Sequence, residues 1–221
     1  MTARQLITEN IIPLRPTDTG IFALNQMEEL QISHLPIVDE AVFVGLISDL
    51  EILALPDPGA IILATKPTLA RAGVREHQHI FEVLKLFSTL NLTLLPVIND
   101  KEQYVGSITL SSLINHLAEM MSTDQPGGII ILDLNDNDYD LVEIASIVES
   151  NNAKILNLSV HTFSDSTKIE VILKLNRVDI GPVLQTFFRY NYLVKASWTN
   201  EDSYHEGIQD RYDALMNYLS I

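Results

Sequence analysis

The sequence has no cysteine among its 221 residues and few basic side chains for its size. Without thiols it cannot form a disulfide framework, a thiolate zinc site or a cysteine nucleophile, and this fits a reducing compartment. Lysine and arginine number 14 against 29 aspartates and glutamates, which gives a formal charge of -15. Because that charge repels phosphate backbones and anionic lipids, we expect neither a nucleic acid nor a membrane as partner.

Long apolar runs are missing as well. Nowhere do about 18 apolar residues follow one another, as a membrane-spanning helix requires, and Met1 to Asn10 contains no apolar run of signal-peptide length. We therefore expect a soluble, untargeted, cytoplasmic protein. Hydrophobic residues still make up 47% of the chain, which is enough to fill more than one compact core. Two or three units are predicted.

The first half of the chain contains an internal repeat. The segment Leu30 to Asp39 returns sixty positions later as Leu90 to Asn99, and each copy places Leu-Pro before two β-branched residues and a turn-forming Asp or Asn. Downstream, Val44 to Ser48 matches Val105 to Thr109, with one residue added in the second turn. A hairpin turn is where such length variation is expected.

Each copy predicts the order β-α-β-β-α. Short leading strands are expected at Ile11 to Leu14 and at Ala72 to Val74. Apolar residues at three-and-four spacing then predict an amphipathic helix. These residues are Ala23, Leu24, Met27 and Leu30 in the first copy and Val83, Leu84, Phe87 and Leu90 in the second. The cluster Pro56 to Gly59 ends the first copy's closing helix. We assign residues 1–60 to the first repeat and 61–121 to the second.

This arrangement resembles CBS domains in tandem. The resemblance rests on the Leu-Pro-Ile-Val-Asp and Leu-Pro-Val-Ile-Asn strands and on the Gly-Leu-Ile-Ser and Gly-Ser-Ile-Thr segments that follow them. It implies that the two repeats pack about a pseudo-twofold axis. It also implies that clefts between them can hold AMP, ADP, ATP, S-adenosylmethionine or a related adenosyl ligand as a regulatory molecule.

The resemblance also implies a set of ligand contacts. In CBS pairs the Ser or Thr after the glycine segment faces phosphate, an Asp three residues later takes the ribose hydroxyls, and the segment through Leu-Pro contacts adenine. The nucleotide-binding candidates carried over in this way are Ile12, His34, Leu35, Pro36, Ser48, Glu51, Ala72, Leu94, Leu95, Pro96, Thr109 and Ser112.

Neither repeat has Asp at the ribose position. Glu51 keeps a carboxylate one methylene further out, whereas Ser112 has none. Because a hydrogen bond to a charged group contributes roughly 1.5 to 3 kcal/mol, the first repeat is the better candidate. Asp49 is interpreted instead as an N-terminal charge or cap of the closing helix.

The acidity of the chain counts against a highly charged nucleotide unless local basic residues line its pocket. The candidates for that role are Arg15, Lys66, Arg71, Arg75 and Lys101.

The second half begins after a linker. Ser122 to Gly128 has linker composition, and the pattern beyond it predicts the order β-α-β-β-α-β. The strands are expected at Ile129 to Leu134, Lys154 to Phe163, Ile169 to Leu175 and Leu193 to Trp198, and the helices at Leu141 to Ser150 and Val183 to Tyr190. This is the ferredoxin-like plan, so the chain is predicted to be α+β, with residues 128–221 as its last domain.

After a CBS pair, such a domain resembles the ACT domain, and the whole arrangement resembles the acetoin-utilisation (AcuB-type) regulatory proteins. ACT domains often bind an amino acid beside the first strand-to-helix loop, where a Pro-Gly step lets the backbone approach. Asp138, Tyr139 and Asp140 are the amino-acid-binding candidates in that loop, and the last two stand where Pro and Gly would be expected. Pairing of sheet edges between subunits is the alternative use of the domain.

The end of the chain carries an apolar stripe. Ile208, Tyr212, Leu215 and Leu219 have helical spacing, which predicts a final helix over 206–219 that packs on the core or at a subunit interface.

Other segments resemble metal-binding or catalytic motifs but lack residues that those motifs require. The acidic run from Asp133 begins like a calcium loop, but Asp138 stands where glycine is needed and Ile144 where a bidentate Glu is needed. His77 and His79 have no third ligand at a recognisable spacing. No Gly-rich phosphate loop, Gly-x-Ser-x-Gly elbow or His-Glu-x-x-His helix is present. We expect no metal, no catalytic residue and no required cofactor.

The sequence thus predicts a non-catalytic, homodimeric regulator that senses an adenosyl small molecule and acts on a regulated protein. Three alternatives stay open. They are a dimerising scaffold with vacant CBS clefts, an amino-acid sensor that uses the ACT-like domain, and an enzyme on the ferredoxin-like half, for which the acidic loop is the only support.

Overall fold

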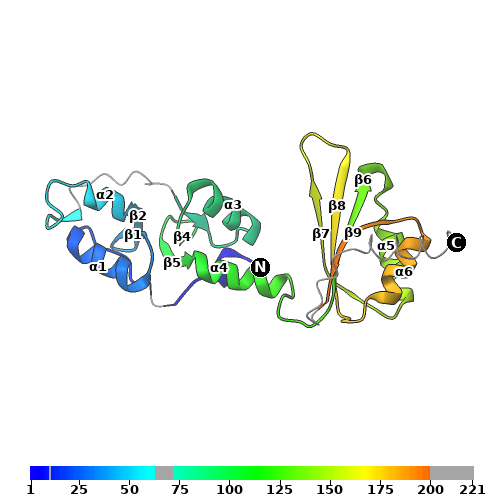
Figure 1. Cartoon of the computed structure of the whole chain (residues 1–221). Helices are drawn as coiled ribbons and strands as arrows, with labels where there is room; N and C mark the ends of the chain where they lie inside the picture. The colour runs from blue at the N-terminus through cyan, green and yellow to red at the C-terminus, as the bar shows by residue number, and fades with distance from the viewer. Residues whose placement is uncertain (10, 63–71, 200–221) are drawn as a thin grey trace. The chain divides into compact units, whose positions relative to one another are not determined.

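The computed structural model describes residues 1–9, 11–62 and 72–199. The chain divides into two compact units, Met1–Leu117 and Ala118–Ile221 (Figure 1). The helix predicted over 206–219 lies outside the described residues.

The first unit contains the two predicted repeats. The first repeat consists of α1 (Gly20–Leu30), β1 (His34–Asp39), β2 (Val42–Ser48) and α2 (Asp49–Leu53). The second consists of β3 (Val74–Arg75), α3 (Ile80–Leu90), β4 (Leu94–Ile98), β5 (Tyr104–Thr109) and α4 (Leu110–Met120), whose last three residues follow the boundary after Leu117. The leading strand predicted at Ile11 to Leu14 is reduced to one parallel bridge, between Leu14 and Ile37.

The two copies form their helices in the same way. Thr19 caps the start of α1, where its hydroxyl accepts a hydrogen bond from the amide of Phe22. The helices α1 and α3 both end on a left-handed residue, Gln31 with φ 54° and Asn91 with φ 51°. The same local sequence signals therefore recur at the same offset in the structure.

The hairpin turns of the two repeats pair with each other. The amide of Phe43 donates to the carbonyl of Glu102 at 3.2 Å, and the amide of Tyr104 donates to the carbonyl of Ala41 at 2.8 Å. Phe43 and Tyr104 are equivalent positions, because they face Val38 and Ile98 after the register shift in each hairpin. The reciprocal bonds relate the repeats by an approximate twofold axis.

The residues that precede each repeat pack against the other one. The short 3-10 helix η1 (Ala3–Leu6) lies on the second repeat, where the amide of Ala3 donates to the carbonyl of Gln78 at 2.9 Å. Figure 1 shows this dark blue segment beside β5 and α4. In the first repeat, the amide of Ile62 donates to the carbonyl of Asp18 at 2.8 Å. Ala3, Leu6 and Ile62 are buried, so each repeat is completed by residues that precede the other in the chain.

One apolar core runs through both repeats. Its strand residues include Leu35, Ile37 and Ile47 in the first copy and Leu95, Val97 and Ile108 in the second. Burial of each such side chain contributes roughly 1.5 to 3 kcal/mol relative to exposure, so the two repeats stabilise each other as a single folding unit.

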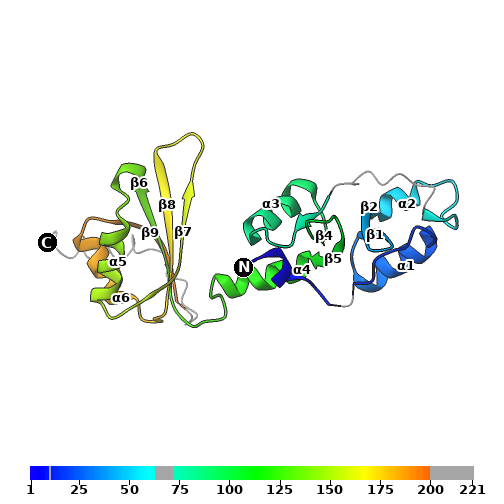
Figure 2. The same cartoon turned by 180° about the vertical axis from the view of Figure 1, so that it is seen from behind.

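The second unit has the predicted order β-α-β-β-α-β. Its elements are β6 (Ile129–Asn135), the 3-10 turn η3 (Asp136–Asp138), α5 (Leu141–Ser150), β7 (Ile155–Thr162), β8 (Lys168–Leu175), α6 (Gly181–Arg189) and β9 (Leu193–Trp198). The strands form one antiparallel sheet in the order β7-β8-β6-β9. Both helices lie on one face of this sheet, as the two opposite views show (Figures 1 and 2). The α+β prediction is confirmed.

Among the residues that the structure describes, no helix is long and apolar enough to cross a membrane. Those residues also contain no group of three or more His, Cys, Asp or Glu side chains that could hold a metal ion.

Candidate functional site

The polar candidates of the first repeat meet where β2 runs into α2. His34 and Ser48 are partners across the antiparallel pair β1–β2. The Glu51 carboxylate accepts hydrogen bonds from the Ser48 amide at 2.8 Å and from the Ser48 hydroxyl at 2.9 Å. The Ser48 hydroxyl in turn accepts from the Glu51 amide at 3.2 Å. Three of the predicted ligand residues are thus brought together.

This reciprocal arrangement is a capping box, and it makes Ser48 the N-cap of α2. Asp49 lies in the first turn of the helix, which confirms its predicted place as a negative charge at the helix N-terminus. The N-cap itself is the preceding residue, Ser48. Glu51 was interpreted as a ribose ligand; in this structure its carboxylate serves the helix start.

The apolar candidates differ widely in exposure. Ile12 is 65% exposed, which leaves its side chain available as a wall. The other six are buried, with little or no solvent-exposed surface. These are Leu35, Pro36, Ala72, Leu94, Leu95 and Pro96.

His34 joins the two repeats. Its Nδ1 lies 3.0 Å from the hydroxyl of Thr93, and that hydroxyl accepts a hydrogen bond from the amide of Ser33 at 2.9 Å. Burial lowers the pKa of His34 from its ordinary value, and the nearby carboxylates of Asp49 and Glu51 oppose this shift. The ring is therefore held neutral at neutral pH.

The polar candidates of the second repeat are bonded to the N-terminal segment. Thr109 is only 7% exposed, and its hydroxyl lies 3.1 Å from those of Thr8 and Ser111. The Ser112 hydroxyl donates to the carbonyl of Leu6 at 3.2 Å. Both predicted ligand groups of this repeat already have partners within the chain.

Gly106 in β5 makes room for the N-terminal residues. A Cβ atom on Gly106 would lie 2.6 Å from Cγ2 of Ile7, which is closer than real Cβ contacts allow. The glycine of the Gly-Ser-Ile-Thr segment therefore serves close packing in the second repeat.

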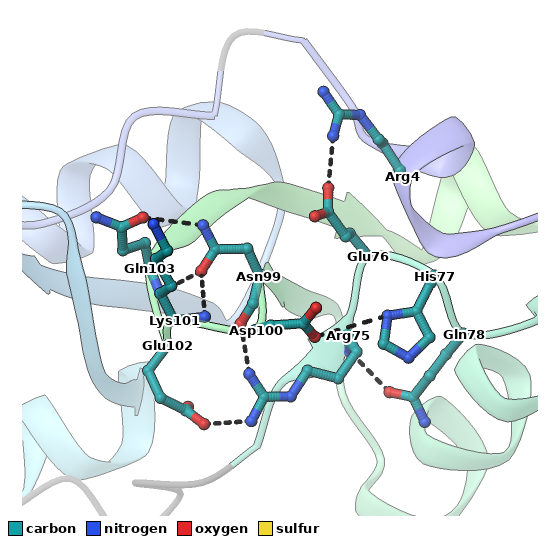
Figure 3. Close-up of polar contacts among 10 residues, drawn as sticks. All are labelled: Arg4, Arg75, Glu76, His77, Gln78, Asn99, Asp100, Lys101, Glu102 and Gln103. Atoms are coloured by element: carbon teal, nitrogen blue, oxygen red, sulfur yellow. Dashed lines mark hydrogen bonds and ion pairs between the residues drawn. The ribbon is translucent and has the colours of Figure 1, made fainter.

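Arg75, one of the basic candidates, is engaged in a polar network at the β4–β5 turn (Figure 3). Its guanidinium donates to the carbonyl of Asn99 and pairs with the carboxylate of Glu102. Beside it, Arg4 pairs with Glu76 at 2.6 Å. The charge of Arg75 is thus partly neutralised by a local acid. Lys66 and Arg71 lie outside the described residues.

The loop between β6 and α5 in the second unit is self-bonded. One carboxylate oxygen of Asp140 accepts from the amides of Val142 at 2.9 Å and Glu143 at 3.1 Å. The side chain of Asn135 donates to Asp138 at 2.8 Å, and Tyr139 packs against the core of the unit. Asp140 therefore occupies the free amides of α5 that the carboxylate of a bound amino acid would need.

A pocket of about 510 Å³ opens beside this loop. It is lined by Asp133, Leu134, Asn135, Asp138, Glu143, Lys168, Tyr190, Asn191, Tyr192 and Leu193. The hydroxyl of Tyr192 donates to Glu143 at 2.7 Å, and burial together with that carboxylate raises the pKa of Tyr192. Asp138 was predicted from its place in the loop, whereas Glu143 and Tyr192 were not, because 49 positions separate these two partners.

The family described as CBS domain matches residues 3–56 and 72–119 of the chain. The match occurs twice, once in each predicted repeat, and so confirms the tandem pair.

Similar solved structures include a CBS domain pair/ACT domain protein from Thermotoga maritima, with 22% identity, 54% of this chain and 98% of that chain covered, and a TM-score of 0.49. CBSX2 in complex with AMP has 21% identity, 53% and 96% coverage, and a TM-score of 0.47. CBSX2 comes from Arabidopsis thaliana.

Among curated proteins, the inosine-5'-monophosphate dehydrogenase of Methanocaldococcus jannaschii is 26% identical over 152 residues. The match covers 67% of this chain and 30% of that enzyme, so the chain spans less than a third of this relative.

Proposed function

We propose that this chain, a tandem pair of CBS domains joined to an α+β domain, is a non-catalytic regulatory protein that binds an adenine nucleotide or related adenosyl ligand in the cleft of its first repeat. The observation that carries the proposal is the meeting of His34, Ser48 and Glu51 where β2 runs into α2. These groups supply a hydroxyl, a carboxylate and an aromatic nitrogen donor within one small region. A nucleotide needs such partners for its phosphate, ribose and base.

The first repeat is favoured over the second because a ligand can more easily replace the hydrogen bonds of its candidate side chains. Ser48 and Glu51 are partly exposed, and a ligand can replace their mutual bonds with bonds of its own. Thr109 and Ser112 are bonded to Thr8 and Leu6, whose buried segment would have to move first. The second repeat also lacks a carboxylate at the ribose position.

Charge favours a ligand with few negative charges. The carboxylates of Asp49 and Glu51 act on His34, and the whole chain carries -15. Each added phosphate therefore meets repulsion. We infer that AMP or S-adenosylmethionine binds more tightly than ADP, and ADP more tightly than ATP.

As a regulator the protein acts in the cytoplasm as a homodimer, and ligand binding changes how it engages a regulated protein. The second unit is an ACT-like domain in this proposal, and it contributes to assembly through its sheet edges. Amino-acid sensing there is disfavoured because Asp140 already caps the helix start.

A dimerising scaffold with vacant clefts is the second candidate. The bonds of Ser48 with Glu51 and of Thr109 with Thr8 favour it, because both sets of ligand groups are satisfied within the chain. A strictly monomeric mass in light scattering at micromolar concentration would contradict both candidates in their dimeric form.

Thermal unfolding with and without millimolar AMP, ADP, ATP or S-adenosylmethionine separates the two candidates. A ligand at about 100 times its dissociation constant stabilises the folded protein by about 2.7 kcal/mol. We expect a shift with the native chain, a reduced shift with Ser48→Ala, and a native-like shift with Ser112→Ala in the second repeat. No shift with any of the four ligands overturns the nucleotide proposal.

A further inference from the structure

A contact between the two repeats fixes the hydrogen on the His34 ring. The Thr93 hydroxyl accepts from the Ser33 amide at 2.9 Å and lies 3.0 Å from Nδ1 of His34. The Thr93 amide also donates to the same Nδ1, at 3.4 Å. Because Nδ1 can accept only when it carries no hydrogen, the neutral ring holds its hydrogen on Nε2.

Nε2 lies on the edge of the ring opposite to Thr93. Among the residues that the structure describes, none is hydrogen-bonded to it. The carboxylates of Asp49 and Glu51 are the charged groups that act on this ring. A further negative group placed at Nε2 would be repelled by these two carboxylates, so the donor suits an uncharged acceptor.

The second repeat has no equivalent of this donor. Leu94 stands at the position of His34, and its side chain is buried. Ser33 and Thr93 are themselves equivalent positions, so the contact is made across the pseudo-twofold axis. Because the second repeat has no histidine here, the ring is present on only one side of that axis.

We propose that Nε2 of His34 donates a hydrogen bond to a ring nitrogen of the bound adenine, a role that rests on the proposed nucleotide site. Thr93 of the second repeat is the positioning residue that holds this tautomer. The cleft of the first repeat is then incomplete without a side chain from the second. A heteroaromatic nitrogen is the uncharged acceptor that a nucleotide offers to such a donor.

Two substitutions separate the two edges of the ring. His34→Asn places an amide near the position of Nδ1 and keeps a bond to Thr93, but it has no group at the position of Nε2. His34→Gln places its amide near Nε2 and loses the bond to Thr93. For the full-length chain we expect His34→Asn to weaken AMP binding about tenfold in calorimetry, since one neutral hydrogen bond is lost, and His34→Gln to weaken it less.

Adenine analogues identify the acceptor. The 1-deaza, 3-deaza and 7-deaza forms of AMP each replace one ring nitrogen with a C–H group. One of them should bind the native protein about tenfold more weakly than AMP does, by the same hydrogen-bond argument, and should bind His34→Asn as well as AMP does. Equal losses for all three analogues in both proteins would overturn the inference.

The role of Thr93 has its own spectroscopic readout. Nitrogen-15 shifts of the His34 ring should show the Nε2–H tautomer in the native chain and a mixture of tautomers in Thr93→Val. A native ring with its hydrogen on Nδ1 overturns the positioning role. If the native chain binds AMP and His34→Asn binds it equally well, only this inference fails; if the native chain does not bind AMP, the proposed function and this inference both fail.

Discussion

Ser48 and Glu51 hold each other at the start of α2, with the Glu51 carboxylate 2.8 Å from the Ser48 amide and 2.9 Å from the Ser48 hydroxyl. The same oxygen atoms are those that we assign to ribose and phosphate. In the proposed complex, the ligand and the helix cap would therefore compete for this one pair of side chains. Binding would change the first turn of α2, and this couples occupancy of the cleft to a surface helix.

The two roles of Glu51 can be separated by substitution. Glu51→Gln keeps the capping box, because a Gln oxygen can also accept from the Ser48 amide, so the free energy of unfolding should change by less than about 0.5 kcal/mol. The loss of the carboxylate should weaken AMP binding about tenfold to a hundredfold. Calorimetry and thermal unfolding measure the two effects. Native affinity in Glu51→Gln would remove the ribose role.

The packing of the N-terminal segment on the second repeat should depend on the Thr8 hydroxyl. Thr8→Val leaves the buried Thr109 amide and hydroxyl without the Thr8 partner that they have at 3.2 and 3.1 Å. We expect a cost of about 1 to 3 kcal/mol and faster hydrogen exchange at the Ala3 amide, which this segment holds on Gln78. Thr162→Val, at the exposed end of β7, is the matched control. Unchanged exchange at Ala3 would show that apolar burial alone holds the segment.

Local signals in the sequence predicted most of the fold. The repeat at sixty residues and the three-and-four spacing predicted the helices α1 and α3. The prediction of a leading strand in the first repeat was wrong in extent, because only Leu14 of that segment pairs with a strand. Apolar residues in a short segment fit a strand and a buried extended loop equally well.

The candidate site was predictable only in part. The Gly-Leu-Ile-Ser pattern led to Ser48 and Glu51, yet the same Ser-x-x-Glu spacing is also a capping box, and that is the role the structure gives it. Thr8 and Thr93 were missed. They meet Thr109 and His34 across 101 and 59 positions of the chain, and contacts made by folding leave no trace in local spacing.

Acid should destabilise the first unit through His34. Burial lowers the pKa of His34 in the folded protein below the ordinary value of 6.5. The unfolded chain therefore binds the proton more readily, so the stability from this group is complete above about pH 6.5 and falls as the pH drops further. The native protein should lose more free energy of unfolding than His34→Asn between about pH 7 and pH 5. Denaturant unfolding at each pH measures the difference, and parallel pH profiles would contradict the assignment.

The stability of the second unit should depend on the absence of a side chain at Gly127. This residue has φ +155°, and a Cβ atom there would lie 1.8 Å from the carbonyl oxygen of Leu175, a backbone atom that cannot swing away. Gly127→Ala should therefore destabilise the second unit by about 1 to 3 kcal/mol or more and leave AMP binding by the first unit unchanged. Gly181→Ala is the control, because its nearest contact is the flexible side chain of Asp179 at 3.2 Å. Equal unfolding curves for the two variants would show that the chain can shift at Gly127 without cost.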